Sequence, residues 1–159
     1  MTNSKLQIYI SLDVLLENEN YFYAIKNDLT KTNPLLLQAI YQIYKDFNNL
    51  VDIIVVCKNK DRDDILEDFI KNLDLKFTYK TLFVDRSDIL SLHDPTTKDH
   101  VLLDTDDDLL YHWEMKYGKS IKYLDEIHRR SNFEFLEIKN NYKTSEEYYK
   151  KLVSYIHLC

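Results

Sequence analysis

The sequence is nearly without glycine, and this shortage limits the kind of site that it can form. Among 159 residues there is one glycine, Gly118, together with only two prolines. Tight turns that wrap a phosphate group use backbone angles that glycine reaches without strain. The sequence therefore does not predict a glycine-rich phosphate-binding loop.

Cysteine and long apolar segments are also scarce. The two cysteines, Cys57 and Cys159, do not form a disulfide framework, and they predict a reduced protein of the cytoplasm. No apolar run approaches the ~20 residues that a transmembrane helix needs. The first residues also lack the apolar centre of a signal peptide. We expect no association with a membrane.

An excess of positive charge is missing as well. The chain has 21 Lys and Arg residues against 27 Asp and Glu residues, which gives a formal net charge of −6. Proteins bind nucleic acids largely by displacing counterions with basic side chains, so this balance predicts no general nucleic-acid binding. A length of 159 residues predicts a single domain over residues 1–159 with a proper apolar core.

Apolar β-type runs alternate with segments of helical periodicity along the chain. The expected strands are residues 6–12, 51–57, 77–84, 100–104 and 120–124. The expected helices begin at Pro34, at the acidic cluster 61–64 and at Asp106, and a last helix over 144–157 follows a capping box of Thr144 and Glu147. This alternation predicts an α/β fold, a doubly wound parallel sheet with helices on both faces.

Polar residues stand where several of these strands end. They are Ser11 and Asp13, Cys57, Asp104, and Arg86 just past another strand. Ligand sites in parallel sheets form at the carboxyl ends of strands, so these residues predict one common site. Simpler interpretations exist: Asp13 could cap a helix, the acidic run 104–108 could begin one, and Cys57 could be a small core residue.

Two segments resemble motifs of a phosphatase superfamily. Ser11-Leu12-Asp13-Val14-Leu15-Leu16 stands where the pattern Asp-x-Asp-Gly-(Val/Thr)-Leu is expected, and residues 102–128, LLDTDDDLLYHWEMKYGKSIKYLDEIH, follow the register of the fourth motif. The chain is similar to the haloacid dehalogenase-like superfamily and, within it, to the 5'(3')-deoxyribonucleotidases of bacteria and phages. The resemblance implies a Rossmann-like core and a much reduced cap over 17–33.

The resemblance also implies what each strand-end residue replaces. Ser11 stands at the position of the attacking aspartate, and Asp13 at that of the aspartate that acts as acid and base. Cys57 takes the place of a Ser or Thr, and Arg86, or alternatively Lys80, takes that of a lysine. Losing a nucleophile typically costs ~10⁴-fold or more in rate, so we expect a catalytically degenerate nucleotidase.

Magnesium is the cofactor that the resemblance implies. Its candidate ligands here are Asp13, Asp104 and Asp108, and Thr105 replaces a further acid of the fourth motif. We expect this Mg²⁺ site to be weak, because the first carboxylate is missing. The five histidines have no metal-ligand spacing, and we assign them no role.

The expected function is therefore the binding of another protein. Tyrosine, with 13 residues, suits protein interfaces, although a low-GC genome enriches it too. Tyr21, Phe22 and Tyr23 of the short cap segment are the candidate contacts. Composition and resemblance together suggest a phage or mobile-element factor for host interaction or anti-defence, in the cytoplasm of a bacterium. The alternatives are a Mg²⁺-dependent 5'-deoxyribonucleotidase of weak or altered activity, and a nucleotide sensor that does not hydrolyse its ligand.

Overall fold

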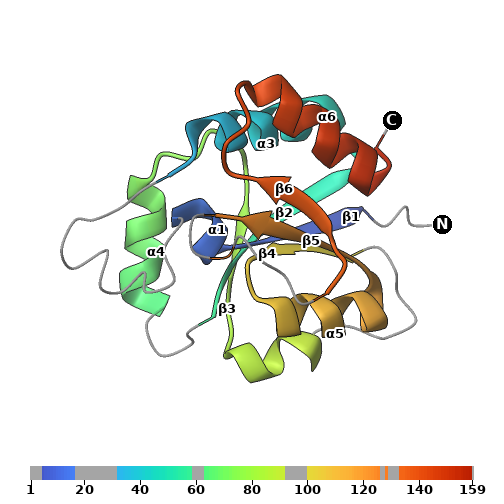
Figure 1. Ribbon diagram of the computed structural model, residues 1–159. Helices are drawn as coiled ribbons and strands as arrows, with labels where there is room; N and C mark the ends of the chain where they lie inside the picture. Colours follow the sequence, from blue (N-terminus) through green and yellow to red (C-terminus); the bar gives the residue numbers. More distant parts are fainter. Residues whose placement is uncertain are drawn as a thin grey trace.

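A six-stranded sheet runs through the computed structural model, which describes residues 5–16, 32–58, 63–91, 100–125, 128 and 133–158 (Figure 1). Its strands are β1 (Leu6–Ser11), β2 (Val51–Cys57), β3 (Lys80–Phe83), β4 (His100–Asp104), β5 (Gly118–Leu124) and β6 (Leu136–Lys139). They lie in the order β3-β2-β1-β4-β5-β6, and every neighbouring pair is parallel. The order changes direction between β1 and β4, which is where such sheets form a site at their carboxyl ends.

Helices cover both faces of this sheet (Figure 1). They are α1 (Leu12–Leu16), α3 (Pro34–Phe47), α4 (Asp63–Asn72), α5 (Asp107–Tyr117), α6 (Ser145–Ile156) and the 3₁₀ helix η2 (Arg86–Ser91). Buried side chains of α3, α4 and α6 form one apolar cluster with the sheet, whereas those of α5 and η2 form a second. Two separate cores on one parallel sheet confirm the expected doubly wound α/β fold.

The sequence marks the ends of these helices with capping residues. The side chains of Asn33, Asp106 and Thr144 each accept a hydrogen bond, at 3.2 Å, from the backbone N–H three residues further on. Gly118 ends α5 with φ of 94°, a left-handed angle that costs glycine little, and β5 starts at the same residue. The only glycine of the chain is thus used where a helix turns directly into a strand.

Some expectations about the elements need correction. Strand β6 was not expected, because it is a four-residue edge strand in which Ile138 is the buried residue and no apolar run marks it. The strand expected over 77–84 is shorter, Lys80–Phe83, and Leu12 begins helix α1 instead of ending β1. The expected cap segment 17–33 lies outside the described residues up to position 31. Among the described helices, none combines the length and the apolar character needed to cross a membrane.

Candidate functional site

The carboxyl ends of four neighbouring strands carry the polar residues of the candidate site. Asp13 follows β1, Lys58 follows β2, Asp104 ends β4 and Asp125 follows β5. All four strands are parallel neighbours in the order β2-β1-β4-β5, so their carboxyl ends lie at the same edge of the sheet. Two of these residues, Asp13 and Asp104, were predicted from the sequence as site residues.

A buried ion pair of three side chains forms the centre of the site. The ammonium Nζ of Lys58 lies 2.9 Å from Oδ2 of Asp13 and 3.0 Å from Oδ2 of Asp104. It also donates a hydrogen bond of 3.1 Å to Oδ1 of Asp104. The side chains of Lys58, Asp13 and Asp104 are 10%, 11% and 1% exposed. Two carboxylates therefore share one ammonium that is largely shielded from water.

Burial governs the protonation of this cluster. Desolvation raises the pKa of Asp13 from 3.8 to about 6, and repulsion by Asp104 adds to the rise, while the charge and hydrogen bond of Lys58 oppose it. Burial lowers the pKa of Lys58, but the two carboxylates outweigh it and the net shift is upward. Oδ1 of Asp13 is buried without a hydrogen-bond partner among the described residues. Lys58 thus stays charged, and Asp13 titrates near neutrality.

Ser11 and Thr105 each form a hydrogen bond with one of the two acids. The Ser11 hydroxyl is fully buried and accepts a hydrogen bond of 3.3 Å from the backbone N–H of Asp13. The backbone N–H of Thr105 donates to Oδ1 of Asp104 at 2.6 Å. The position at which the resemblance implies an attacking carboxylate thus holds a neutral hydroxyl that is used within the turn.

Cys57 is buried beside this cluster as a small core residue. Its side chain belongs to the apolar cluster that α3, α4 and α6 form with the sheet. Burial raises the pKa of its thiol to about 12, and the nearby charge of Asp13 adds to the rise. A thiol of this kind is neither a nucleophile nor a metal ligand at neutral pH.

Of the two basic residues suggested for the lysine position, Arg86 lies near the site and Lys80 does not. Arg86 makes a bidentate ion pair with Asp106, with Nε 2.6 Å from one carboxylate oxygen and a terminal nitrogen 3.0 Å from the other. Lys80 begins β3 and is exposed, so it lies at the opposite, amino-terminal edge of the sheet. Lys58 is the basic residue that contacts Asp13 and Asp104. Its place directly after the apolar run 51–57 was the signal in the sequence that could have identified it.

A histidine and an aspartate form a second polar pair at this edge. Asp125 is 3% exposed, and its Oδ1 accepts a hydrogen bond from the backbone N–H of His128 at 2.6 Å. Nδ1 of His128 lies 2.9 Å from the same oxygen, and the charge of His128 lowers the pKa of Asp13, although burial of Asp13 has the larger and opposite effect. Sequence reasoning gave His128 no role, because a single histidine has no spacing that indicates a partner.

The described side chains do not form the usual ligand set of magnesium. Mg²⁺ requires oxygen ligands in near-octahedral geometry. In the described part of the chain, no three His, Cys, Asp or Glu side chains are grouped so that they could hold a metal ion. Asp108 is exposed in the first turn of α5, and the ammonium of Lys58 lies between Asp13 and Asp104. The residues present therefore fit a resident ammonium better than a magnesium ion.

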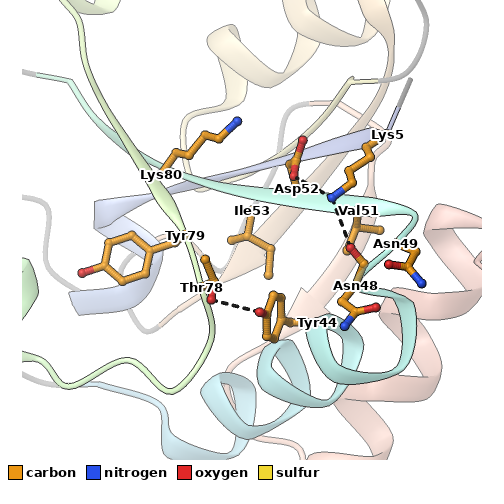
Figure 2. A pocket seen from close by; sticks show the side chains of 10 residues that line it. All are labelled: Lys5, Tyr44, Asn48, Asn49, Val51, Asp52, Ile53, Thr78, Tyr79 and Lys80. Atoms are coloured by element: carbon orange, nitrogen blue, oxygen red, sulfur yellow. Dashed lines mark hydrogen bonds and ion pairs between the residues drawn. The ribbon is translucent and has the colours of Figure 1, made fainter. Parts of the chain in front are cut away.

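A separate cavity of about 230 Å³ opens at the other edge of the sheet (Figure 2). Its polar lining includes Lys5, whose Nζ lies 3.6 Å from Asp52, and a hydrogen bond of 2.9 Å from the Tyr44 hydroxyl to Thr78. These groups largely satisfy one another. The candidate protein contacts Tyr21, Phe22 and Tyr23 lie outside the described residues.

Comparison with known proteins finds similarity at the level of the fold. No protein-family model matches the sequence, and no curated protein matches it. The structure is similar to that of D,D-heptose 1,7-bisphosphate phosphatase from Burkholderia thailandensis, with a TM-score of 0.61 and 10% identity over 94% of this chain and 99% of that one. It is also similar to a hypothetical protein from Xanthomonas campestris, with a TM-score of 0.57 and 12% identity over 96% of this chain and 84% of that one. At these identities the likeness shows a shared α/β fold and nothing finer.

Proposed function

We propose that this protein is a catalytically degenerate form of a phosphatase fold that acts by binding another protein. The observation that carries the proposal is the ion pair in which Lys58 lies between Asp13 and Asp104. In a working site of the family the first acid attacks phosphorus. Here that position is Ser11, whose hydroxyl has no described base within hydrogen-bond distance.

The charges at the strand ends also disfavour a phosphate ligand. Lys58 supplies one positive charge against the carboxylates of Asp13 and Asp104, and Asp125 is paired with His128. The described side chains thus carry a net negative charge at neutral pH. A phosphate monoester is itself an anion, and unit charges 4 Å apart interact by about 4 kcal/mol at an effective dielectric of 20. This repulsion favours a binding protein over a nucleotide sensor.

Binding of a protein partner is supported by the overall composition and by two exposed side chains of α5. The chain has 13 tyrosines and a net charge of −6. On helix α5, Tyr111 and Met115 are 40% and 67% exposed, and large side chains of this kind commonly serve as interface contacts. We also propose that the protein is related to deoxyribonucleotidases and is encoded by a phage or mobile element, on the basis of the sequence resemblance and the composition.

Asp13 favours one second candidate function, a weak phosphohydrolase. A carboxyl group whose pKa is raised to about 6 by burial holds a proton in part of the molecules near neutral pH. Such a group can protonate a leaving oxygen. An activity of this kind would depend on Asp13 and would rise as the pH falls toward 6.

Phosphate release decides between these functions. Wild type and the Asp13→Ala variant are assayed with deoxynucleoside monophosphates, heptose bisphosphate and p-nitrophenyl phosphate, with and without Mg²⁺. Asp106→Ala serves as the matched control, because Asp106 is an aspartate of the same edge that pairs with Arg86. The proposal expects no release by wild type above the Asp13→Ala background. Turnover that Asp13→Ala abolishes and Asp106→Ala keeps would overturn it in favour of the phosphohydrolase.

A further inference from the structure

We infer that the ammonium of Lys58 is a built-in replacement for a divalent cation, and that it keeps such ions away from Asp13 and Asp104. The inference rests on the proposed function only in taking the strand ends as the site. It concerns a property that phosphate release does not measure, namely which cation neutralises the two acids.

The ammonium of Lys58 lies between the carboxylates of Asp13 and Asp104 and neutralises part of their charge. Nζ of Lys58 contacts Oδ2 of Asp13 at 2.9 Å and both carboxylate oxygens of Asp104, at 3.1 and 3.0 Å. An ammonium has three N–H donors, and these three contacts match them. The space between the two acids is therefore occupied by a side chain of the protein itself.

Charge explains why a metal ion does not share this space. A dication between the same acids would lie within a few ångströms of the ammonium, in surroundings where repulsion is weakly screened. The ammonium form of Lys58 is favoured by its direct contacts with two carboxylates. Position 11 holds a serine hydroxyl, so no third carboxylate is present there to offset the positive charge of a metal ion beside the ammonium.

The same contacts predict what removal of the ammonium does. Without Lys58, two buried carboxylates from neighbouring strands face each other with no counter-ion, and Oδ1 of Asp13 already lacks a described hydrogen-bond partner. Such a pair of acids is an oxygen-donor site for a hard divalent cation. Replacing Lys58 by a neutral residue therefore converts an ammonium site into a metal site.

The test measures Mn²⁺ binding by electron paramagnetic resonance of the free ion. The proteins are wild type, Asp104→Asn, Lys58→Gln and the double variant Lys58→Gln/Asp104→Asn. Lys76→Gln is the matched control, because Lys76 forms an exposed pair with the single carboxylate of Asp74 at 2.7 Å. We expect Lys58→Gln to bind one Mn²⁺ at least about tenfold more tightly than wild type does. The double variant and Lys76→Gln should bind no better than wild type.

Thermal denaturation provides a second readout on the same proteins. A ligand that binds the folded state raises Tm by mass action, so Mn²⁺ should raise the Tm of Lys58→Gln and leave that of wild type unchanged. Saturable Mn²⁺ binding by wild type that Asp104→Asn removes would overturn the inference, and this measurement does not need Lys58→Gln to fold. Equal Mn²⁺ affinity of folded Lys58→Gln and wild type would overturn it as well.

Discussion

Nζ of Lys58 lies 3.0 Å from Oδ2 of Asp104, although 46 residues separate them in the chain. The contact joins the carboxyl end of β2 to that of β4 across the intervening strand β1. A lysine of the protein itself thus lies between acidic residues at the carboxyl ends of neighbouring strands.

Removal of the Lys58 charge should destabilise the folded protein. Breaking a buried ion pair by removing one partner leaves the other charge unpaired, which costs about 3–5 kcal/mol. We expect Lys58→Met to lower the free energy of unfolding in urea by an amount of this order. Lys76→Met removes the exposed pair with Asp74 and should cost less than about 1 kcal/mol. Equal, small losses in both variants would show that Lys58 is not held as described.

Asp13 should make stability fall as the pH rises. Burial raises its pKa from 3.8 to about 6, so the folded state holds the proton more tightly than the unfolded state does. Its contribution is complete below about pH 3.8 and is lost as the pH rises through about 6. Relative to Asp13→Asn, wild type should lose up to about 3 kcal/mol across this window, as measured by urea denaturation.

Asp106 is a control for Asp13, because its contribution to stability should change with pH in the opposite direction. Burial alone would raise its pKa, but the hydrogen bonds from Arg86 and from the backbone N–H of Leu109 outweigh burial and lower it. The stability difference between wild type and Asp106→Asn should therefore shrink as the pH falls. If the Asp13 and Asp106 difference curves slope the same way, the described electrostatics of the strand ends are incorrect.

An aspartate at position 11 should destabilise the folded protein. Ser11 is fully buried beside Asp13, so Ser11→Asp adds a carboxylate to a cluster with the single ammonium of Lys58. Without metal, we expect Ser11→Asp to be at least ~3 kcal/mol less stable than the neutral isostere Ser11→Asn at pH 8. The difference should narrow at pH 5, because the new carboxyl group can then take up a proton. Matching stabilities at pH 8 would count against the charge balance proposed here.

The thiol of Cys57 should not react in the folded protein. It is buried, and its pKa is raised to about 12 by burial and by the charge of Asp13. In a Cys159→Ser background, a thiol reagent such as DTNB should label Cys57 at pH 8 only after urea has unfolded the chain. Rapid labelling without denaturant would mean that the end of β2 is open to solvent.

Much of the fold follows from local sequence signals. The β-branched run 51–57, Pro34 and the capping threonine Thr144 each mark an element whose bounds agree with the structure. Strand β6 was not predicted, because an edge strand of four residues with one buried residue, Ile138, has no periodic pattern in the sequence. Its position depends on pairing with β5, which is a tertiary property.

The site was predictable only in part. Asp13 and Asp104 could be placed because each stands at the end of an apolar run, which brings them to one edge of a parallel sheet. Lys58 was missed because a lysine after a strand is usually a solvated residue, and its burial depends on the two acids that surround it. Arg86 was favoured by its position after a strand, but the nearby Asp106 is its partner in the structure.

The central proposal, that this protein does not transfer phosphate, is tested most directly by a single-turnover experiment. Wild-type protein in excess over a labelled deoxynucleoside monophosphate, with Mg²⁺ present, reveals even one slow chemical event that steady-state assays miss. The account predicts that the labelled phosphate stays on the nucleoside for wild type and for Asp13→Ala alike. Stoichiometric phosphate release by wild type that is absent in Asp13→Ala would contradict it, and would identify Asp13 as a working acid.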